Sequence, residues 1–426
     1  MPLSLPDTVL LACDLGTTTI AASLLDAATG QRLATGGALN PQRQFGADVV
    51  TRLAAAVASP DTRSEMGRLV NAELEALARS LLADAGVAES SLTMVAIAGN
   101  PTMEHLLLDL PVDSLAHIPY RPLFREGRSL QTRDLGWSLA AGLYLFPLPG
   151  GFVGGDLVAF LYGEELSDAQ STPHAARLYL DLGTNAEIAL CCGDRVFATS
   201  AAAGPAFEGG NLSCGMAALP GAIALVECAD GKVRIETIGS GVPTGVCGSG
   251  ALSAIVSLRR EGVIDASGRL RSSAEIPSNL GNRIVERTGG RGFVLYRDAR
   301  HEVLISQEDI RQVQLAKGAI RAGIEVLLAR AGLAAADLAE VIVTGSFGMV
   351  LGAGLLRDLG VIPPAVSSVR FGADGALAGV ERYLRRPDKE GELAALASRL
   401  AVVPLSGNPL FEAHFIRFMD LPESGC

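Results

Sequence analysis

The feature that most constrains this chain is a short segment that occurs twice. LLACDLGTTTIAASLL (10–25) and LYLDLGTNAEIAL (178–190) each run from an apolar strand through Asp-Leu-Gly-Thr into a second apolar strand. In both copies a third strand-like segment follows, beginning at Arg32 and at Arg195. Two matching hairpins predict a duplicated lobe, because each copy would build the same part of a sheet.

The remaining sequence alternates strand-like runs with alanine-rich helical runs, which is typical of α/β proteins. We expect strands at 9–13, 19–25, 93–98, 178–182, 186–192, 222–227 and 340–344. We expect helices at 47–58, 62–85, 249–260, 307–331 and 388–400.

The helix at 307–331 has the clearest end signals. Ser306 can cap it, Asp309 stands at the capping-box position, and Gly332 can end it. Residues 113–150 are rich in proline and are expected to form loop and irregular strand. The polar stretch 165–177 predicts a boundary between an N-terminal lobe (1–170) and a C-terminal lobe (171–426).

Composition excludes several classes of protein. With 426 residues, 49% hydrophobic and 19% charged, the chain is globular and long enough for two or three domains. The net charge of −11 without a basic block argues against nucleic acids and anionic membrane surfaces as partners. No apolar run has the length of a membrane helix, and MPLSLPDTVL does not resemble a signal peptide, so we expect a cytoplasmic protein.

The seven cysteines include no C-x-x-C pair. We interpret them, Cys214 and Cys247 included, as small packed residues of a reduced protein rather than as redox groups or ligands of zinc or an iron–sulfur cluster.

The two repeated turns have the residues of a phosphate site. Asp14 and Asp181 end apolar strands, where carboxylates can hold Mg²⁺ through water. The glycines allow tight turns, and the following N–H and hydroxyl groups can bind phosphate oxygens. The residues concerned are Gly16, Thr17, Thr18, Thr19, Gly183, Thr184 and Asn185. One such turn alone is equally an ordinary hairpin; the second copy favours the phosphate site.

Two further glycine-rich segments fit a nucleotide. In EVIVTGSFGMVLGAG (340–354) a buried strand breaks at Gly345, Ser346, Phe347 and Gly348, which would allow a base or ribose to approach, although a plain strand–helix turn fits as well. In AAGPAFEGGNL (201–212), Glu208, Gly209, Gly210 and Asn211 could meet the ribose, or could simply start a helix. GVCGSG (245–250) could bind an anion at a helix N-terminus or form a packed turn.

Phosphate-1, phosphate-2 and adenosine elements in this order resemble the actin-like ATPase superfamily of sugar kinases, heat-shock chaperones and actin. The resemblance implies an α/β fold of duplicated ribonuclease-H-like lobes with a nucleotide cleft between them, and ATP with Mg²⁺ as ligands. In the chaperones of this superfamily, the helix comparable to 307–331 supports the nucleoside. Lys317, on the apolar stripe of the helix 307–331, either contacts the nucleotide or extends its stem along that stripe.

Six motifs, in the same order, resemble a narrower family, the reductive activators of corrinoid proteins. They are ALNPQRQFGADVVTRL (38–53), AGNPTMEHLLLDL (98–110), GGFVGGDLVAFL (150–161), AAAGPAFEGGNLSCGM (201–216), GVCGSGALSAIV (245–256) and ISQEDIRQVQLAKGAI (305–320). That family couples ATP hydrolysis to reduction of Co(II) corrinoid to Co(I) in cobalamin-dependent methyltransferase systems.

The resemblance implies a corrinoid protein or cobalamin-dependent methyltransferase as the partner, which carries the corrinoid. It covers the ATPase region only, because the iron–sulfur domain typical of the family does not precede Asp14. We therefore expect electrons from a separate donor, a ferredoxin or flavoprotein, and no cluster in this chain. Whether the protein forms a homodimer stays open.

Three carboxylates are the expected catalytic groups. Asp14 and Asp181 would position Mg²⁺ and water, and Glu187 would orient the water, a role we favour over that of a buried structural acid. Asn100, Thr102 and His105 follow a strand and could face the cleft or a partner. Two other functions share the fold: a small-molecule kinase, and a nucleotide-switched, chaperone-like binding protein without a redox role.

Overall fold

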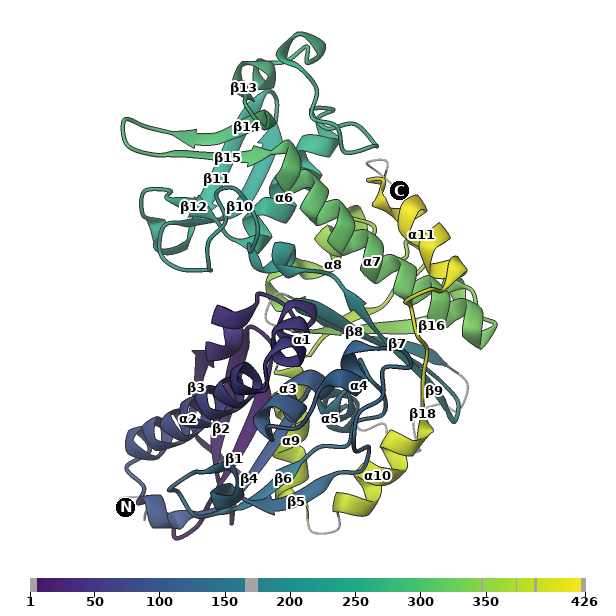
Figure 1. The fold of residues 1–426 in the computed structure, drawn as a ribbon. Coiled ribbons are helices and arrows are strands. Elements are labelled where there is room, and N and C mark those ends of the chain that lie inside the picture. The colour runs from purple at the N-terminus through teal and green to yellow at the C-terminus, as the bar shows by residue number, and fades with distance from the viewer. Residues whose placement is uncertain (1–5, 165–174, 346–347, 373, 387–388, 423–426) are drawn as a thin grey trace. The chain divides into compact units, whose positions relative to one another are not determined.

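The computed structural model describes residues 6–164, 175–345, 348–372, 374–386 and 389–422. The chain forms two compact units (Figure 1). Unit 1 consists of Met1–His174, Gly193–Ala198 and Ala373–Val402, and unit 2 of Ala175–Cys192, Thr199–Gly372 and Val403–Cys426. Most of the predicted boundary stretch lies outside the described residues.

Unit 1 is built on a mixed six-stranded sheet with the order β3-β2-β1-β4-β6-β5. The strands are β1 (Val9–Leu15), β2 (Thr19–Asp26), β3 (Arg32–Leu39), β4 (Leu92–Gly99), β5 (Arg128–Gln131) and β6 (Gly142–Leu145). β1 pairs antiparallel with β2 and parallel with β4, so that Leu15 lies beside Gly99. The carboxyl ends of β1 and β4 therefore meet at one edge of the sheet.

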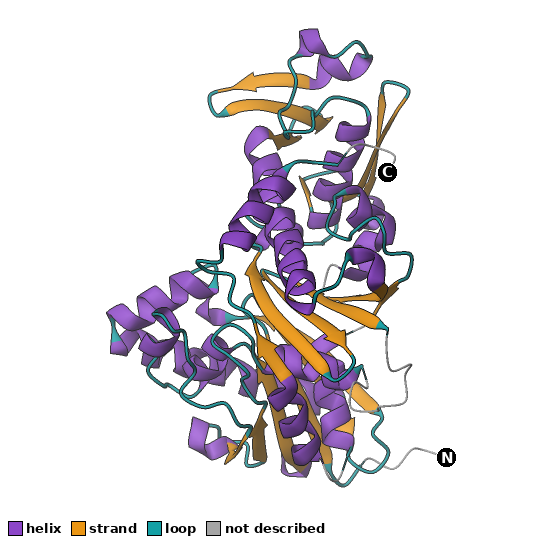
Figure 2. Cartoon of the chain, turned by 90° about the vertical axis from the view of Figure 1, so that its right-hand side faces the viewer, coloured by secondary structure: helices purple, strands orange, loops and turns teal. Residues whose placement is uncertain are grey.

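Helices cover both faces of this sheet (Figure 2). α2 (Pro60–Asp84) packs on β2 and β3, on α1 (Val49–Ala58) and on α3 (Pro101–Leu107). α5 (Gly155–Gly163) and α9 (Gly375–Arg385) pack on each other and on β4, although they are far apart in the sequence (Figure 1). Ser23 of β2 donates a hydrogen bond to Glu381 of α9 (2.5 Å), which fixes this late helix on the first hairpin. The unit also contains the helices α4 (Asp113–Ala116) and α10 (Lys389–Arg399).

A second six-stranded sheet has the order β17-β16-β7-β8-β9-β18. Its strands are β7 (Ala176–Leu182), β8 (Asn185–Cys192), β9 (Arg195–Ala202), β16 (Leu338–Thr344), β17 (Val369–Phe371) and β18 (Leu400–Val402). β7 pairs antiparallel with β8 and parallel with β16, as β1 pairs with β2 and β4. The order β9-β8-β7-β16-β17 thus repeats β3-β2-β1-β4-β6, which confirms the predicted duplication and the actin-like α/β fold.

Unit 2 also contains an insertion between β9 and the long helix α7 (Gln307–Ala331). It has two three-stranded sheets and the helix α6 (Gly248–Arg260). The strands are β10 (Ala222–Ala229), β11 (Lys232–Thr237), β12 (Gly245–Val246), β13 (Ile284–Arg287), β14 (Gly290–Arg297) and β15 (Glu302–Ser306).

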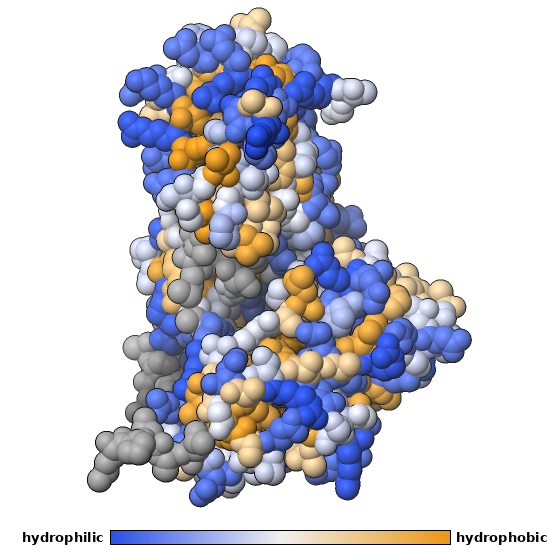
Figure 3. All heavy atoms as spheres, turned by 90° about the vertical axis from the view of Figure 1, so that its left-hand side faces the viewer, coloured by the Kyte–Doolittle hydropathy of each residue, from blue (hydrophilic) through white to orange (hydrophobic). Residues whose placement is uncertain are grey.

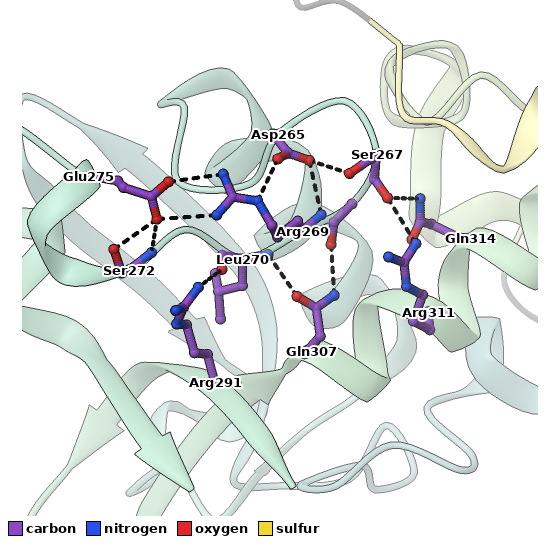
Figure 4. Close-up of polar contacts among 11 residues, drawn as sticks. Asp265, Ser267, Arg269, Leu270, Ser272, Glu275, Arg291, Gln307, Arg311 and Gln314 are labelled. Atoms are coloured by element: carbon purple, nitrogen blue, oxygen red, sulfur yellow. Dashed lines mark hydrogen bonds and ion pairs between the residues drawn. The ribbon is translucent and has the colours of Figure 1, made fainter.

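A network of polar contacts attaches the loop 265–275 of the insertion to α7 (Figure 4). Arg269 bridges Asp265 and Glu275, while the Gln307 side chain accepts from the Leu270 amide (2.7 Å) and donates to the Gly268 carbonyl (2.8 Å). Two turns further along α7, Gln314 donates to the Ser267 carbonyl (3.1 Å). Because the loop's backbone groups are satisfied by side chains of α7, the loop and the helix form one structural unit.

The ends of α7 are as the sequence predicts. The Ser306 hydroxyl accepts from the Asp309 amide (3.1 Å), the Asp309 carboxylate accepts from the Ser306 amide (2.8 Å), and Gly332 ends the helix in a left-handed conformation. α7 packs on β8 and on the C-terminal helix α11 (Pro409–Met419). α8 (Gly348–Asp358) follows β16.

The predicted strands and helices are all present, with ends that differ by a few residues. The segment 113–150, expected to be loop and irregular strand, contains α4, β5 and β6. Among the described residues there is no helix with the length and apolar character needed to cross a bilayer.

Candidate nucleotide site

The phosphate-1 turn, residues 14–19, joins β1 to β2 at the edge where β4 also ends. Asp14 is half-buried, Thr17 is buried and Thr19 is exposed. The Asn40 side chain donates to the Gly16 carbonyl (2.9 Å), and the Asn40 amide donates to the Thr18 carbonyl (2.9 Å). Gly16 is required by the tightness of the turn, because a Cβ there would lie 2.5 Å from the Thr19 carbonyl oxygen.

Asn100, which follows β4, holds this turn from the other side. Its side-chain nitrogen donates to the Thr17 hydroxyl (3.0 Å), and its side-chain oxygen caps α3 by accepting from the Met103 amide (3.0 Å). The start of α5 packs closely against Asn100, because a Cβ on Gly154 would lie 2.5 Å from the Asn100 Cα. Asn40 and Asp156 are not among the residues predicted for the site, although both lie in motifs that carry the family resemblance.

Two carboxyl groups lie near the phosphate-1 turn: Glu104 of α3 is buried, and Asp156 of α5 is half-buried. Glu104 accepts a hydrogen bond from the Gly99 amide (3.2 Å), and its other oxygen, Oε2, has no partner among the described residues. Burial, together with the nearby Asp156, raises the pKa of Glu104 well above its usual value. Burial raises the pKa of Asp156 to about 6. The state in which Glu104 and Asp156 retain a proton is therefore favoured over the state in which both carboxyl groups are ionised.

Glu104→Gln should stabilise the protein relative to the wild type by an amount that grows as the pH rises above about 4.5. A carboxyl whose pKa is raised on folding contributes stability below its unfolded pKa and loses it as the pH rises through the folded pKa. Glutamine keeps the acceptor for the Gly99 amide and cannot ionise. Urea unfolding of both proteins between pH 4.5 and 8 measures the difference, with Glu73→Gln as the control; a difference that shrinks with pH would contradict the assignment.

His105 of α3 is fully buried and uncharged. Its Nδ1 lies 2.7 Å from the Pro101 carbonyl oxygen, its Nε2 accepts from the Leu123 amide (3.0 Å), and its ring stacks on Phe124. Burial lowers the pKa of His105 to about 4. His105 therefore attaches the segment around Leu123 to α3, a role that spacing alone did not indicate.

The free energy of unfolding should fall as the pH decreases from about 6.5 to about 4, because the unfolded chain binds a proton at His105 that the folded chain excludes. The contribution is at most about 3 kcal/mol. Comparing urea midpoints of the wild type and His105→Phe across this range isolates it, and His117→Phe at an exposed histidine is the control. Parallel pH profiles for wild type and His105→Phe would rule out the assignment.

The phosphate-2 turn, residues 181–185, joins β7 to β8 in unit 2. Asp181 lies directly opposite Glu187 across the hairpin. Glu187 is only 8% exposed and accepts from the Ser200 hydroxyl (3.2 Å). The Thr184 hydroxyl donates to Glu208 (2.8 Å), and the Thr184 carbonyl accepts from the Gly204 amide (2.8 Å).

Gly345, predicted to lie near the adenosine, is packed against the phosphate-2 turn. β16 pairs with β7 so that Thr344 lies beside Asp181, and Gly345 then turns with a φ of 95°. A Cβ on Gly345 would lie 2.3 Å from the Leu182 carbonyl oxygen and 2.8 Å from Asp181 Oδ1. Ser346 and Phe347 lie outside the described residues, and Gly348 begins α8.

The segment 207–211 joins the phosphate-2 turn to α6. Glu208 contacts Thr184, and Gly209 has a positive φ of 79°. A Cβ on Gly209 would lie 3.1 Å from the Gly248 amide nitrogen at the start of α6, so the segment and that helix end are in contact. Gly210 packs on Pro205, and Asn211 is exposed with a φ of 57°. Glu208 and Gly345, both predicted for the nucleotide site, therefore contact the phosphate-2 turn.

Lys317, also predicted for the nucleotide site, contacts the end of α11. Its ammonium is buried and donates to the carbonyl oxygens of Phe418 (2.6 Å) and Asp420, at the end of α11. Burial and the nearby Arg321 lower the pKa of Lys317 to about 8. In the structure this lysine satisfies the last carbonyls of the C-terminal helix.

The donor set of each turn fits a Mg²⁺–phosphate ligand. Asp14 and Asp181 offer the carboxylate oxygens that Mg²⁺ binds. In each turn the carboxylate stands two residues before the glycine and three residues before a threonine. Turns of this kind can bind a phosphate through backbone N–H groups, while the glycines leave room for the ligand to approach.

Two family models match the chain, and together they cover nearly all of it. Residues 175–426 match the C-terminal domain of RACo, the ASKHA domain, and residues 9–169 match the RACo middle region.

Two similar proteins have names that refer to the activation or reduction of corrinoid proteins. The corrinoid activation enzyme RamQ of Eubacterium limosum is 32% identical over 410 residues, which are 94% of this chain and 68% of RamQ. The [Co(II) methylated amine-specific corrinoid protein] reductase of Methanosarcina barkeri is 29% identical over 220 residues, 46% of this chain and 36% of that protein. A solved structure of a reductive activator for a corrinoid, iron–sulfur protein superimposes with a TM-score of 0.87 at 29% identity, covering 99% of this chain and 67% of the other.

Proposed function

Since the chain belongs to the RACo family of reductive activators of corrinoid proteins, we propose that it hydrolyses ATP to help return an inactive Co(II) corrinoid to Co(I). The corrinoid is carried by a partner, a corrinoid protein or cobalamin-dependent methyltransferase. The observation that carries the ATPase part is the repeated hairpin, with Asp14 and Asp181 each preceding a glycine turn at the end of an equivalent strand.

ATP hydrolysis of this type depends on positioning and on stabilising charge more than on a strong base. Mg²⁺, when bound with ATP, would neutralise charge on the phosphates, and Asp14 and Asp181 would hold it through water. Thr17, Thr18 and Thr184 would bind phosphate oxygens, with the backbone N–H groups that follow the glycine of each turn. Asn40 and Asn100 fix the first turn before the ligand arrives.

Glu187 would orient the attacking water. It lies across the hairpin from Asp181, and its contact with the Ser200 hydroxyl holds the carboxylate in place. Glu208, Gly209, Gly210 and Gly345 would lie against the nucleoside side of the ligand, a role supported by the close packing of 207–211 and Gly345 around the phosphate-2 turn.

Reduction of Co(II) would require a separate electron donor, a ferredoxin or a flavoprotein. The six cysteines in the described residues are free thiols. Burial raises the pKa values of Cys13, Cys214 and Cys228, which keeps these thiols protonated. ATP would act by stabilising a complex in which the corrinoid loses its lower ligand, since this raises the cobalt potential.

The test is an anaerobic reconstitution of the purified chain with a Co(II) corrinoid protein, titanium(III) citrate as donor, and ATP with Mg²⁺. We expect the visible spectrum of the cobalt to change from Co(II) to Co(I) with ATP and not with ADP. Phosphate should be released without a phosphorylated product, which distinguishes the activator from a kinase. If corrinoid proteins bind in the presence of ATP and the cobalt spectrum never changes, the chain is a nucleotide-switched binding protein instead.

A further inference from the structure

A loop of unit 1, residues 117–125 (HIPYRPLFR), exposes large apolar side chains between arginines. Ile118 is 80% exposed and Leu123 is 53% exposed. Arg121 and Arg125 are exposed beside them. Large apolar groups at the surface are unfavourable in water, and several together are typical of a protein–protein contact.

The loop is held firmly rather than left free. The Leu123 amide donates to His105, and the ring of Phe124 is buried against the His105 imidazole with a centroid distance of 5.2 Å. Arg125 donates to the Pro149 carbonyl (2.7 Å), and its own carbonyl accepts from the Leu148 amide (2.9 Å). These contacts hold the backbone of the loop and the ring of Phe124 in place.

Tyr120 in the middle of the loop gives independent support. Its φ is 53°, a conformation that is rare for a bulky residue and persists only where the surroundings impose it. The ring of Tyr120 packs on Phe152 (4.8 Å), and Gly151 is so close that a Cβ on it would lie 1.9 Å from the Tyr120 carbonyl oxygen. A surface that is already ordered loses little entropy when a partner binds.

One short helix joins this loop to the phosphate-1 turn. α3 is capped by Asn100, whose side chain donates to Thr17, and it carries His105, which accepts from Leu123. The segment 150–154 makes a second connection, because Gly151 contacts Tyr120 and Gly154 contacts Asn100. A change in the phosphate-1 turn on nucleotide binding can therefore reach the loop through packed groups.

The charge of the loop suits an acidic partner surface. The chain as a whole has a formal charge of −11, whereas the loop 117–125 contains two arginines and no acidic residue. Arginine is enriched at protein interfaces, and exposed apolar groups often mark contact sites.

A second apolar surface lies in unit 2. In Figure 3 hydrophobic residues gather in the part of the molecule that β10–β15 form, where Leu219 and Val242 are more than half exposed. The loop 117–125 is preferred because α3 connects it to the phosphate-1 turn, which is the property that an ATP-driven activator needs at its partner contact.

We propose that the loop 117–125 is the docking surface for the corrinoid protein, with Ile118 and Leu123 as its apolar contacts and Arg121 as its electrostatic contact. This inference rests on the proposed function and names the part of the chain that recognises the partner. The arginines speed association with an acidic surface, and the apolar pair slows dissociation.

The test uses the full chain and a Co(II) corrinoid protein that the wild type reduces in the reconstitution above. Ile118→Ser with Leu123→Ser should weaken binding, measured by biolayer interferometry, at least tenfold, mainly through faster dissociation. Arg121→Glu should slow association severalfold and reduce its dependence on salt. ATP hydrolysis by the chain alone should stay within twofold of the wild type in both variants.

Matched controls lie elsewhere on unit 1. Val50→Ser removes a side chain that is 66% exposed on α1, and Arg133→Glu reverses an exposed charge outside the loop. Both should bind like the wild type. If the wild type reduces the corrinoid protein and the loop variants bind it and reduce it as well as the controls do, the docking inference is wrong while the proposed function stands. If the wild type reduces no corrinoid protein, the proposed function fails first. Light scattering identifies a second copy of this chain as the occupant if the loop variants change only its oligomeric state, and that result also overturns the inference.

Discussion

Asp181→Asn should abolish ATP hydrolysis, lowering the turnover at least about a hundredfold, while the protein stays folded. Asparagine has nearly the shape of aspartate, so the β7–β8 hairpin and the contact with Gly345 can persist. What is lost is the negative charge that would hold Mg²⁺ at the phosphates. Phosphate release measured with saturating ATP gives the effect, and circular dichroism with thermal unfolding establishes that the fold is intact.

The control for this variant is Asp194→Asn in the exposed turn between β8 and β9. It removes one carboxylate from the same meander without touching the phosphate-2 turn, and it should hydrolyse ATP like the wild type. Turnover at the wild-type rate in Asp181→Asn would remove the basis for placing a nucleotide at this turn.

Gly345→Ala should produce the largest loss of stability, about 3 kcal/mol or more, together with loss of ATP hydrolysis. Its φ of 95° is unfavourable for alanine, and the added Cβ would lie 2.3 Å from the Leu182 carbonyl oxygen and 2.8 Å from the Asp181 carboxylate. The clash can be relieved only by moving β16 away from β7 or by displacing Asp181, and either change disturbs the phosphate-2 turn.

Gly332→Ala separates the two causes. Gly332 ends α7 with a φ of 73°, and a Cβ there would have no atom within 4 Å. This variant therefore has the backbone cost alone, about 1 kcal/mol, and should keep full ATP hydrolysis. Urea unfolding of both variants compares the costs, and equal losses would show that close packing at Gly345 contributes nothing.

The sequence predicted the local structure well because local signals determine it. Alternating apolar residues with a glycine turn give each hairpin, and Ser306, Asp309 and Gly332 give the ends of α7. The duplicated lobe followed because the same hairpin occurs twice, and the second sheet does repeat the strand order of the first. The actin-like fold followed from the resemblance of the motifs to that superfamily.

The sequence was less informative wherever a residue's role depends on a distant segment. Lys317 has the pattern of a cation on an apolar helix face, which fits a nucleotide contact and a structural contact equally. Its hydrogen bonds to the carbonyls of Phe418 and Asp420 come from a helix that the sequence analysis did not predict. His105 and Glu104 likewise carry no local signal of burial, and their shifted pKa values arise from packing against α5 and the loop 117–125.

By itself, then, the sequence determined the two hairpins, the acid and glycine of each phosphate turn, and the family to which the motifs belong. Only the tertiary structure decided that α9 packs on the first sheet, that Gly345 touches Asp181, and that α3 joins Thr17 to Leu123. The physical reason is the range of the interactions. Turns and caps form between residues a few positions apart, whereas close packing and burial are set by segments that meet only when the whole chain has folded.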